Sequence, residues 1–232
     1  MVQIRLADQR ITGAEALVRW FDPELGMVPP SEFIPIAERL GLVGGITDWV
    51  LHQALAEVSR CVDPSVSVAV NFSALDFYQP DLVQRTSIAL AEANVDACCL
   101  IVELTESVAA QDVQRVNSQL QEIKALGAGI SLDDFGTGYS SLSYLRQFPI
   151  DSLKIDISFV RDLPDSNDAL AIVTAIVSMA DALGLSTIAE GVENERQAEA
   201  LKVLGVNLCQ GYLYSHPVPP SEFHRLIEAQ FR

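Results

Sequence analysis

Short apolar runs alternate with stretches of helical periodicity along the whole chain. Runs of branched apolar residues predict strands, and apolar residues recurring every three or four positions predict amphipathic helices. The predicted strands span residues 2–7, 14–20, 66–72, 99–104, 129–134, 152–157, 186–190 and 207–211. The predicted helices span residues 31–40, 46–59, 80–93, 111–126, 140–147, 167–183, 194–204 and 220–230. Eight strands alternating with helices are typical of the α/β class and of a (β/α)8 TIM-like barrel.

The connection between the first two predicted strands sets them apart from the others. Residues 7–12 are too few for a helical crossover, so we expect these two strands to pair antiparallel. Gly127, Gly184 and Gly205 each follow a predicted helix, a position where glycine commonly ends a helix. No proline- or serine-rich linker and no internal repeat divides the chain. We therefore expect one domain over residues 1–232, a barrel with one antiparallel strand near the N-terminus.

Carboxylate and amide side chains stand at or near the ends of the predicted strands. They are Glu15, Asn71, Glu103, Asp133, Asp134 and Glu190. Buried carboxylates are costly unless they are paired or bind a metal, and the carboxyl ends of barrel strands meet at one mouth. Adjacent carboxylates such as Asp133 and Asp134 repel each other unless a cation lies between them. The pattern predicts a metal site with oxygen ligands. Because Glu15 lies in the antiparallel region, we expect it to reach this mouth by another route.

A different explanation exists for each of these residues taken singly. A strand-end carboxylate is often the cap of the following helix, and Asp133 and Asp134 before a glycine-containing loop could form such a cap pair. Capping does not require Asn71 or Glu103 at their positions, however. The set as a whole therefore favours the metal site.

The overall composition limits the classes of partner. Hydrophobic residues make up 49% of the chain and the mean hydropathy is +0.24, so a large core can form. No apolar run reaches the roughly 18 residues of a membrane span, which predicts a cytoplasmic domain without membrane contact. The net charge of -16 argues against binding to a DNA or RNA duplex, which requires a basic face.

The cysteines lack zinc-ligand spacing, and we expect them to be reduced core residues: Cys61, Cys98, Cys99 and Cys209.

A series of short motifs follows one another along nearly the whole chain. They read EAL at 15–17, PPSEFIPIAERLGL at 29–42, NFS at 71–73, ELTES at 103–107, LDDFGTGYSSLSYL at 132–145, LKID at 153–156, AEGVE at 189–193 and QGYLYS at 210–215. One tripeptide alone carries little information, but in this combination and order the chain resembles the EAL domain family. These domains are bacterial phosphodiesterases that hydrolyse cyclic di-GMP.

The resemblance implies a reaction and a set of metal ligands. It implies opening of cyclic di-GMP to linear pGpG with two divalent cations, Mg²⁺ or Mn²⁺. The first cation would be held by Glu15, Asn71, Glu103 and Asp133. Asp133 would bridge to the second cation, with Asp134 and Glu190 nearby.

The resemblance also implies catalytic residues. Lys154 resembles the catalytic lysine that holds or helps to deprotonate the attacking water, and the alternative is an ordinary lysine at a strand end. Two neighbouring cations would lower the pKa of this lysine. Glu190 could act in proton transfer as well as in metal binding.

Four further residues are candidates for contact with the substrate. They are Leu17, Arg19, Glu193 and Gln210. Arg19 carries a planar donor fork suited to a phosphate. The alternatives are that Gln210 is the polar end of a core strand, and that Glu193 begins the helix expected from residue 194.

Two residues are expected to support the site without binding the metal directly. By resemblance, Glu106 holds in place the loop that begins with Asp133 and Asp134 and contains Gly136 and Gly138. Asp156 lies on the same strand as Lys154 and is expected outside the ligand shell.

Several expectations concern partners and competing functions. The resemblance implies a homodimer and regulatory PAS or GGDEF domains in the parent protein. We expect this domain to be excised from that longer protein, with an N-terminus slightly shorter than is usual in the family. The main alternative is a catalytically silent EAL domain that acts as a cyclic di-GMP receptor or protein-interaction module. With the resemblance set aside, a metal-dependent barrel enzyme of the enolase or aldolase kind also fits carboxylates beside a lysine.

Overall fold

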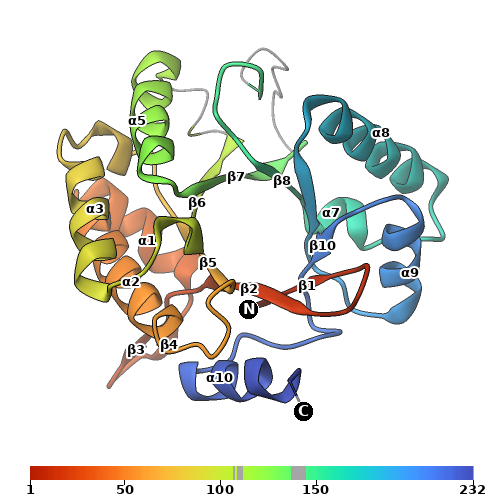
Figure 1. Cartoon of the computed structure of the whole chain (residues 1–232), viewed down its shortest axis with the longest axis horizontal. Helices are drawn as coiled ribbons and strands as arrows, with labels where there is room; N and C mark the ends of the chain where they lie inside the picture. Colours follow the sequence, from red (N-terminus) through yellow and green to blue (C-terminus); the bar gives the residue numbers. More distant parts are fainter. Residues whose placement is uncertain (107, 109–111, 137–144, 232) are drawn as a thin grey trace.

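The strands of the molecule close into a barrel that is surrounded by helices (Figure 1). The computed structural model describes residues 1–106, 108, 112–136 and 145–231. The barrel strands are β1 Val2–Arg5, β2 Ile11–Ala16, β5 Ser67–Asn71, β6 Leu100–Thr105, β7 Gly129–Phe135, β8 Ser152–Ile155, β9 Ser186–Ala189 and β10 Leu208–Cys209. Their order around the barrel is β1-β10-β9-β8-β7-β6-β5-β2. The predicted (β/α)8 architecture is confirmed.

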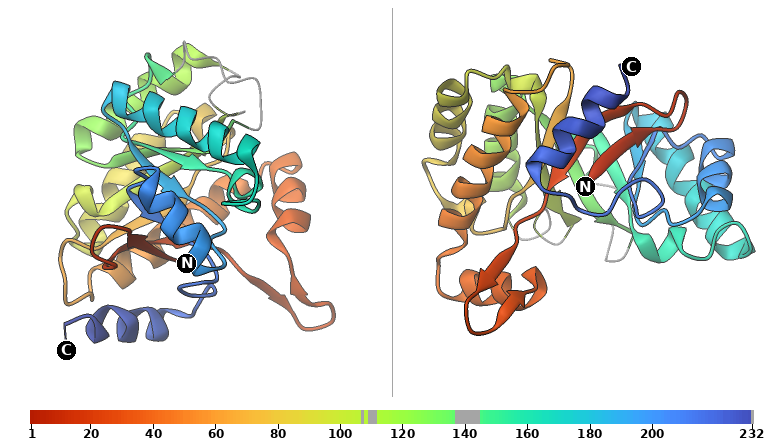
Figure 2. Two further views of the ribbon diagram at one scale, coloured as in Figure 1. Left: turned by 90° about the vertical axis from the view of Figure 1, so that its right-hand side faces the viewer. Right: turned by 90° about the horizontal axis from the view of Figure 1, so that it is seen from below.

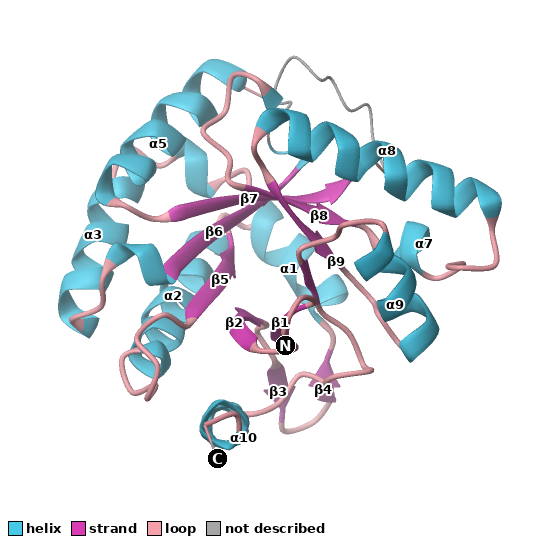
Figure 3. Ribbon diagram, turned by 45° about the vertical axis from the view of Figure 1, so that its right-hand side comes forward, coloured by secondary structure: helices cyan, strands magenta, loops and turns pink. Residues whose placement is uncertain are grey.

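The helices lie on the outside of the strands, as Figure 3 shows by colour. They are α1 Pro30–Arg39, α2 Val43–Val58, α3 Leu82–Ala93, α5 Val113–Leu126, α7 Ile157–Val160, α8 Asn167–Leu183, α9 Glu195–Val203 and α10 Pro220–Ala229, with the short 3-10 helices η1 Asp76–Tyr78 and η2 Ala97–Cys99. Gly127 and Gly184 cap their helices in the left-handed conformation, as expected. Within the described residues, no helix has both the length and the apolar character needed to cross a membrane.

Among the barrel strands in the described part of the chain, only β1 is reversed, which confirms the expected antiparallel pairing of the first two strands. It pairs antiparallel with both of its neighbours, β2 and β10. β2 pairs parallel with β5, with Glu15 opposite Ala69. The expectation that Glu15 reaches the mouth by another route is therefore wrong, because β2 has the same direction as the other parallel strands. Glu15 reaches the carboxyl end of the barrel as its counterparts do.

The predicted strand at 14–20 divides into two structures. β2 ends at Ala16, and the chain then leaves the barrel to form a two-stranded hairpin of β3 Trp20–Asp22 and β4 Gly26–Val28. This hairpin projects from the body of the molecule (Figure 2). Phe21 is 72% exposed, so the apolar run that suggested a buried strand continues into a solvent-facing arm. Most of the predicted helix at 140–147 lies outside the described residues.

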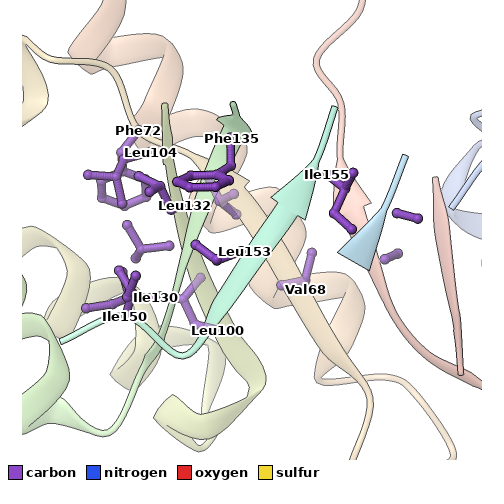
Figure 4. Packing of buried hydrophobic residues seen from close by; sticks show 14 of the residues in the cluster. Val68, Phe72, Leu100, Leu104, Ile130, Leu132, Phe135, Ile150, Leu153 and Ile155 are labelled. Carbon is purple, nitrogen blue, oxygen red and sulfur yellow. The ribbon is translucent and has the colours of Figure 1, made fainter. Parts of the chain in front are cut away.

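The core lies between the barrel and its helices (Figure 4). Leu100, Ile130, Leu132 and Leu153 are buried there on β6, β7 and β8. Residues between them in sequence have the opposite orientation, since successive strand side chains alternate between two faces. This alternation places Glu103, Ser131, Asp133, Ser152 and Lys154 on the inward face of the barrel. The same pattern that builds the apolar core thus creates a polar interior.

The cysteines differ in their exposure. Cys99 and Cys209 are buried, Cys61 is partly buried, and Cys98 is exposed. All four are free thiols, so they form no disulfide. The expectation of a core position is wrong for Cys98, which lies in the short helix η2 on the surface.

Candidate metal centre

Carboxylates from four strands or strand ends converge at one mouth of the barrel. Oxygens of Glu15, Glu103 and Asp133 lie within 4.8 Å of one another, and we call these residues the deep group. Oxygens of Asp133, Asp134 and Glu190 also lie within 4.8 Å of one another, and we call these residues the shallow group. Asp133 belongs to both groups. One carboxylate can therefore serve two neighbouring cation positions.

An irregularity in β7 allows two consecutive aspartates to join these groups. In a regular strand, Asp133 and Asp134 would point to opposite faces. The pairing of β7 with β8 shifts register between Leu132 and Phe135, and Asp134 adopts a left-handed backbone with φ of 56°. Its backbone N–H donates to Asp133 Oδ1 at 2.8 Å. Such bulges re-aim side chains, and aspartate tolerates the left-handed conformation better than most residues.

Lys154 extends from β8 into the middle of these carboxylates and is 1% exposed. Its Nζ lies 2.8 Å from Glu190 Oε1, 2.9 Å from Asp133 Oδ2, 3.2 Å from Glu103 Oε2 and 3.5 Å from Glu15 Oε2. Burial lowers the pKa of this ammonium, but the four carboxylates outweigh burial and raise it well above its usual value. The lowered pKa expected beside two cations stays a prediction, since it depends on those cations.

The carboxylates carry more negative charge than one ammonium neutralises. Burial raises the pKa of Glu103 well above its ordinary value and that of Glu190 to about 7. Burial and the neighbouring Asp133 raise the pKa of Asp134. Glu103 Oε1 is buried without a hydrogen-bond partner among the described residues. Excess charge and an unpartnered oxygen both indicate that this donor set is suited to a hard divalent cation.

Two amides hold Glu15 in place. Asn71 Nδ2 donates to Glu15 Oε1 at 2.9 Å, and Gln210 Nε2 donates to Glu15 Oε2 at 2.7 Å. These bonds and Lys154 outweigh burial, so the pKa of Glu15 is lowered. Gln210 Nε2 also donates to Glu190 Oε1 at 2.8 Å. The amide expected on the substrate side thus bridges one carboxylate of each group.

A cavity of about 290 Å³ adjoins the metal centre. Leu17, Arg19 and Asn71 line it together with residues of α1 and α2. Leu17 and Arg19 follow β2 directly, and the Arg19 side chain is exposed. Two of the expected substrate contacts therefore share a cavity with an expected metal ligand.

The remaining candidates lie at the margin of the site. Glu193 is exposed, and its backbone N–H donates to Gln197 Oε1 in the capping box that begins α9, which favours the helix-start alternative. Asp156 Oδ1 accepts from the Ser158 backbone N–H and caps α7.

Glu106 is buried after β6. The residues of the loop it is expected to hold, 137–144, lie outside the described part of the chain.

One residue at the centre was not among the candidates. Gln3 on β1 is buried, and its Nε2 donates to Gln210 Oε1 at 3.3 Å. The signal that could have identified Gln3 is its place between Val2 and Ile4 in an apolar strand. Successive strand side chains point to opposite faces, so Gln3 points to the barrel interior when Val2 and Ile4 point to the core.

The sequence is similar to known proteins over nearly its whole length. A model of the EAL domain family matches residues 3–217. The bifunctional diguanylate cyclase/cyclic di-GMP phosphodiesterase MucR of Pseudomonas aeruginosa is 43% identical over 213 residues, which cover 90% of this chain and 31% of MucR. The cyclic di-GMP phosphodiesterase PdeR of Escherichia coli is 41% identical over 217 residues, covering 93% of this chain and 33% of PdeR. The chain thus corresponds to a minor part of each of these longer proteins.

Solved structures with the same fold are also similar in sequence. The PaMucR phosphodiesterase in complex with c-di-GMP has a TM-score of 0.91 at 40% identity, covering 96% of this chain and 91% of that chain. The EAL domain of Mycobacterium smegmatis DcpA has a TM-score of 0.81 at 31% identity, covering 98% of this chain and 93% of that chain.

Proposed function

The chain belongs to the EAL domain family, and from this premise we propose that it hydrolyses cyclic di-GMP to linear pGpG with two divalent cations, Mg²⁺ or Mn²⁺. The observation that carries the proposal is the pair of carboxylate groups that share Asp133. Two adjoining carboxylate sets suit two cations held close together, as in two-metal hydrolytic sites, whereas a structural ion pair requires one set at most.

The ligands of the two cations follow from the two groups. Glu15, Glu103 and Asp133, with Asn71 beside them, would hold the deep cation. Asp133, Asp134 and Glu190 would hold the shallow cation. When bound, the two cations would neutralise charge on the phosphate and make a water molecule more acidic.

Lys154 and Glu190 would hold the attacking water and remove its proton. The two side chains contact each other at 2.8 Å, so a proton can pass between them. Glu190, whose pKa is raised to about 7, would take the proton, whereas Lys154 as an ammonium would hold the water oxygen by donating to it. Lys154 would accept a proton only where bound cations lower its pKa. Arg19 would orient the phosphate with its donor fork, and Leu17 would contact the rest of the substrate in the adjoining cavity.

Other parts of the proposal concern supporting residues and context. Glu106 would hold the loop after β7, and Glu193 and Asp156 would act from the margin of the site. We also propose a single domain over 1–232 that works in the cytoplasm, as a homodimer and beside regulatory domains such as PAS or GGDEF. The multidomain relatives support the last point, because MucR combines two activities in a longer chain.

The direct test is incubation of the purified chain with cyclic di-GMP and Mg²⁺ or Mn²⁺, with pGpG quantified by chromatography. We expect metal-dependent product that is lost with EDTA and in Glu15→Ala. Glu195→Gln, an exposed change on α9, is the matched control and should retain activity. Nucleotide binding without product would support the receptor alternative. Absence of both binding and product would contradict the proposal.

A further inference from the structure

The antiparallel strand β1 contributes one polar side chain to the barrel interior. Gln3 is 2% exposed and lies between the strand that carries Glu15 and the strand that leads to Gln210. It pairs with Gly13 of β2. A Cβ at Gly13 would lie 2.7 Å from the Ser67 backbone oxygen and 3.4 Å from Gln3 Oε1. The glycine therefore leaves the space that the Gln3 amide occupies.

The contact of Gln3 with Gln210 has a defined direction. Gln3 Nε2 donates to Gln210 Oε1, while Gln210 Nε2 donates to Glu15 and Glu190. If the Gln210 amide were rotated by half a turn, its carbonyl oxygen would face the two carboxylate oxygens. Glu15 and Glu190 would then lose the hydrogen bonds that Gln210 Nε2 donates to them. An amide bonded through its oxygen to a donor keeps its nitrogen toward the carboxylates.

We propose that Gln3 is a positioning residue for the metal centre, which it serves by fixing the orientation of the Gln210 amide. Gln210, 3% exposed, then holds one carboxylate of the deep group and one of the shallow group at a constant separation. Gln210 contacts one oxygen of each carboxylate, so the other oxygen, Glu15 Oε1 or Glu190 Oε2, keeps a lone pair for a cation. This inference rests on the proposed two-cation function.

A purely structural role would have different consequences. Gln3 would then be a buried polar residue whose bond to Gln210 could be exchanged for apolar packing without effect on the carboxylates. The two roles differ in whether the effect of Gln3 depends on Gln210. A double-mutant cycle measures this dependence.

The test compares Gln3→Met, Gln210→Met and the double variant by calorimetric titration with Mn²⁺ and by steady-state kinetics. Gln3→Met should weaken binding of the shallow cation about tenfold and lower kcat, with little change in KM. The double variant should be no weaker than Gln210→Met. Gln119→Met, which removes another buried glutamine that donates to the Gln79 backbone oxygen, is the matched control and should keep wild-type affinity.

A second readout does not depend on metal. In the metal-free protein, the Gln210 side-chain amide should give protected, separately shifted NMR signals that broaden in Gln3→Met. Wild-type signals in Gln3→Met, or additive losses in the double variant, would overturn the inference. If the wild-type chain neither binds Mn²⁺ nor hydrolyses cyclic di-GMP, the proposed function fails, and the NMR comparison still decides whether Gln3 orients Gln210.

Discussion

The deep and shallow groups lie at the same mouth of the barrel but are held in different ways. Glu15, Glu103 and Asp133 are buried and project from the interior of paired strands. Asp134 and Glu190 are partly exposed, the first at a register shift and the second just after β9. Strand pairing therefore sets the deep positions, whereas local backbone geometry sets the shallow ones.

This difference in support predicts a difference in cation binding. The deep carboxylates are held on paired strands, so a cation there needs displacement of Lys154 Nζ but little rearrangement of the backbone. Carboxyls of both groups have raised pKa values, Glu103 in the deep group and Asp134 and Glu190 in the shallow group, so protons compete with a cation at each group and the expected difference rests on preorganisation. We expect the deep cation to bind tightly and the shallow cation to bind more weakly.

The largest expected effect comes from the centre of the deep group. Glu103→Gln keeps the shape of the side chain but removes a ligand charge, so turnover should fall roughly 10³-fold, the scale of losing a directly acting group. The same change removes the cost of burying this carboxylate and its repulsion from Glu15 and Asp133, so the metal-free protein should gain about 0.5–2 kcal/mol of stability. Activity assays and thermal unfolding with EDTA check both effects. A less stable variant, or one with normal turnover, would show that Glu103 is a structural carboxylate.

Lys154→Met tests the ammonium that contacts both groups. Loss of proton transfer should lower kcat by about 10²–10³-fold. Cation affinity should rise, because the ammonium no longer competes for the same oxygens. Kinetics and Mn²⁺ titration of the same preparation measure the two effects. A fall in both kcat and cation affinity would mean that Lys154 mainly maintains the arrangement of the carboxylates.

Asp134→Asn affects the shallow group and leaves the deep group intact. One Mn²⁺ should still bind with wild-type affinity, while the second should be lost and activity should fall about 10²-fold. The stoichiometry of calorimetric titration distinguishes the two cations. Loss of both cations would mean that the groups form one inseparable site.

The smallest effect is the dependence of the shallow cation on pH. Below pH 7 Glu190 retains a proton that the cation must displace, so affinity should fall up to about tenfold per pH unit. Titrations between pH 6 and 8 measure this slope, and Glu190→Gln should abolish it.

The stability of the metal-free protein depends on pH in the opposite direction to the affinity for the shallow cation. The metal-free folded state keeps this proton between the ordinary glutamate pKa of 4.5 and about 7, whereas the unfolded state releases it. Stability without metal should therefore fall as the pH rises through that window. A rise in stability over the same window would contradict the raised pKa of Glu190.

The sequence predicts much of the deep group and less of the shallow group. Strand periodicity and the strand-end carboxylate Glu103 are local properties, so the barrel and the position of Glu103 follow from the pattern. Glu15 stands near the start of the predicted strand 14–20, and the parallel pairing of β2 that brings it to the mouth was not predicted. The shared orientation of Asp133 and Asp134 depends on how β7 pairs with β8, which periodicity cannot show.

Local sequence patterns also do not predict the contacts that form when the barrel closes. Gln3 and Gln210 are 207 positions apart and meet only because β1 pairs with β10. The hairpin of β3 and β4 was missed for a different reason. Trp20 and Phe21 have the composition of a buried strand but lie on an exposed arm.

The most direct test of two unequal cation sites is a Mn²⁺ titration of the metal-free protein, with bound metal and cyclic di-GMP hydrolysis measured on the same samples. We predict two equivalents, of which the first binds tightly without activity and the second binds more weakly as pGpG formation appears. Full activity after one equivalent, or binding of a single cation at saturation, would contradict this account.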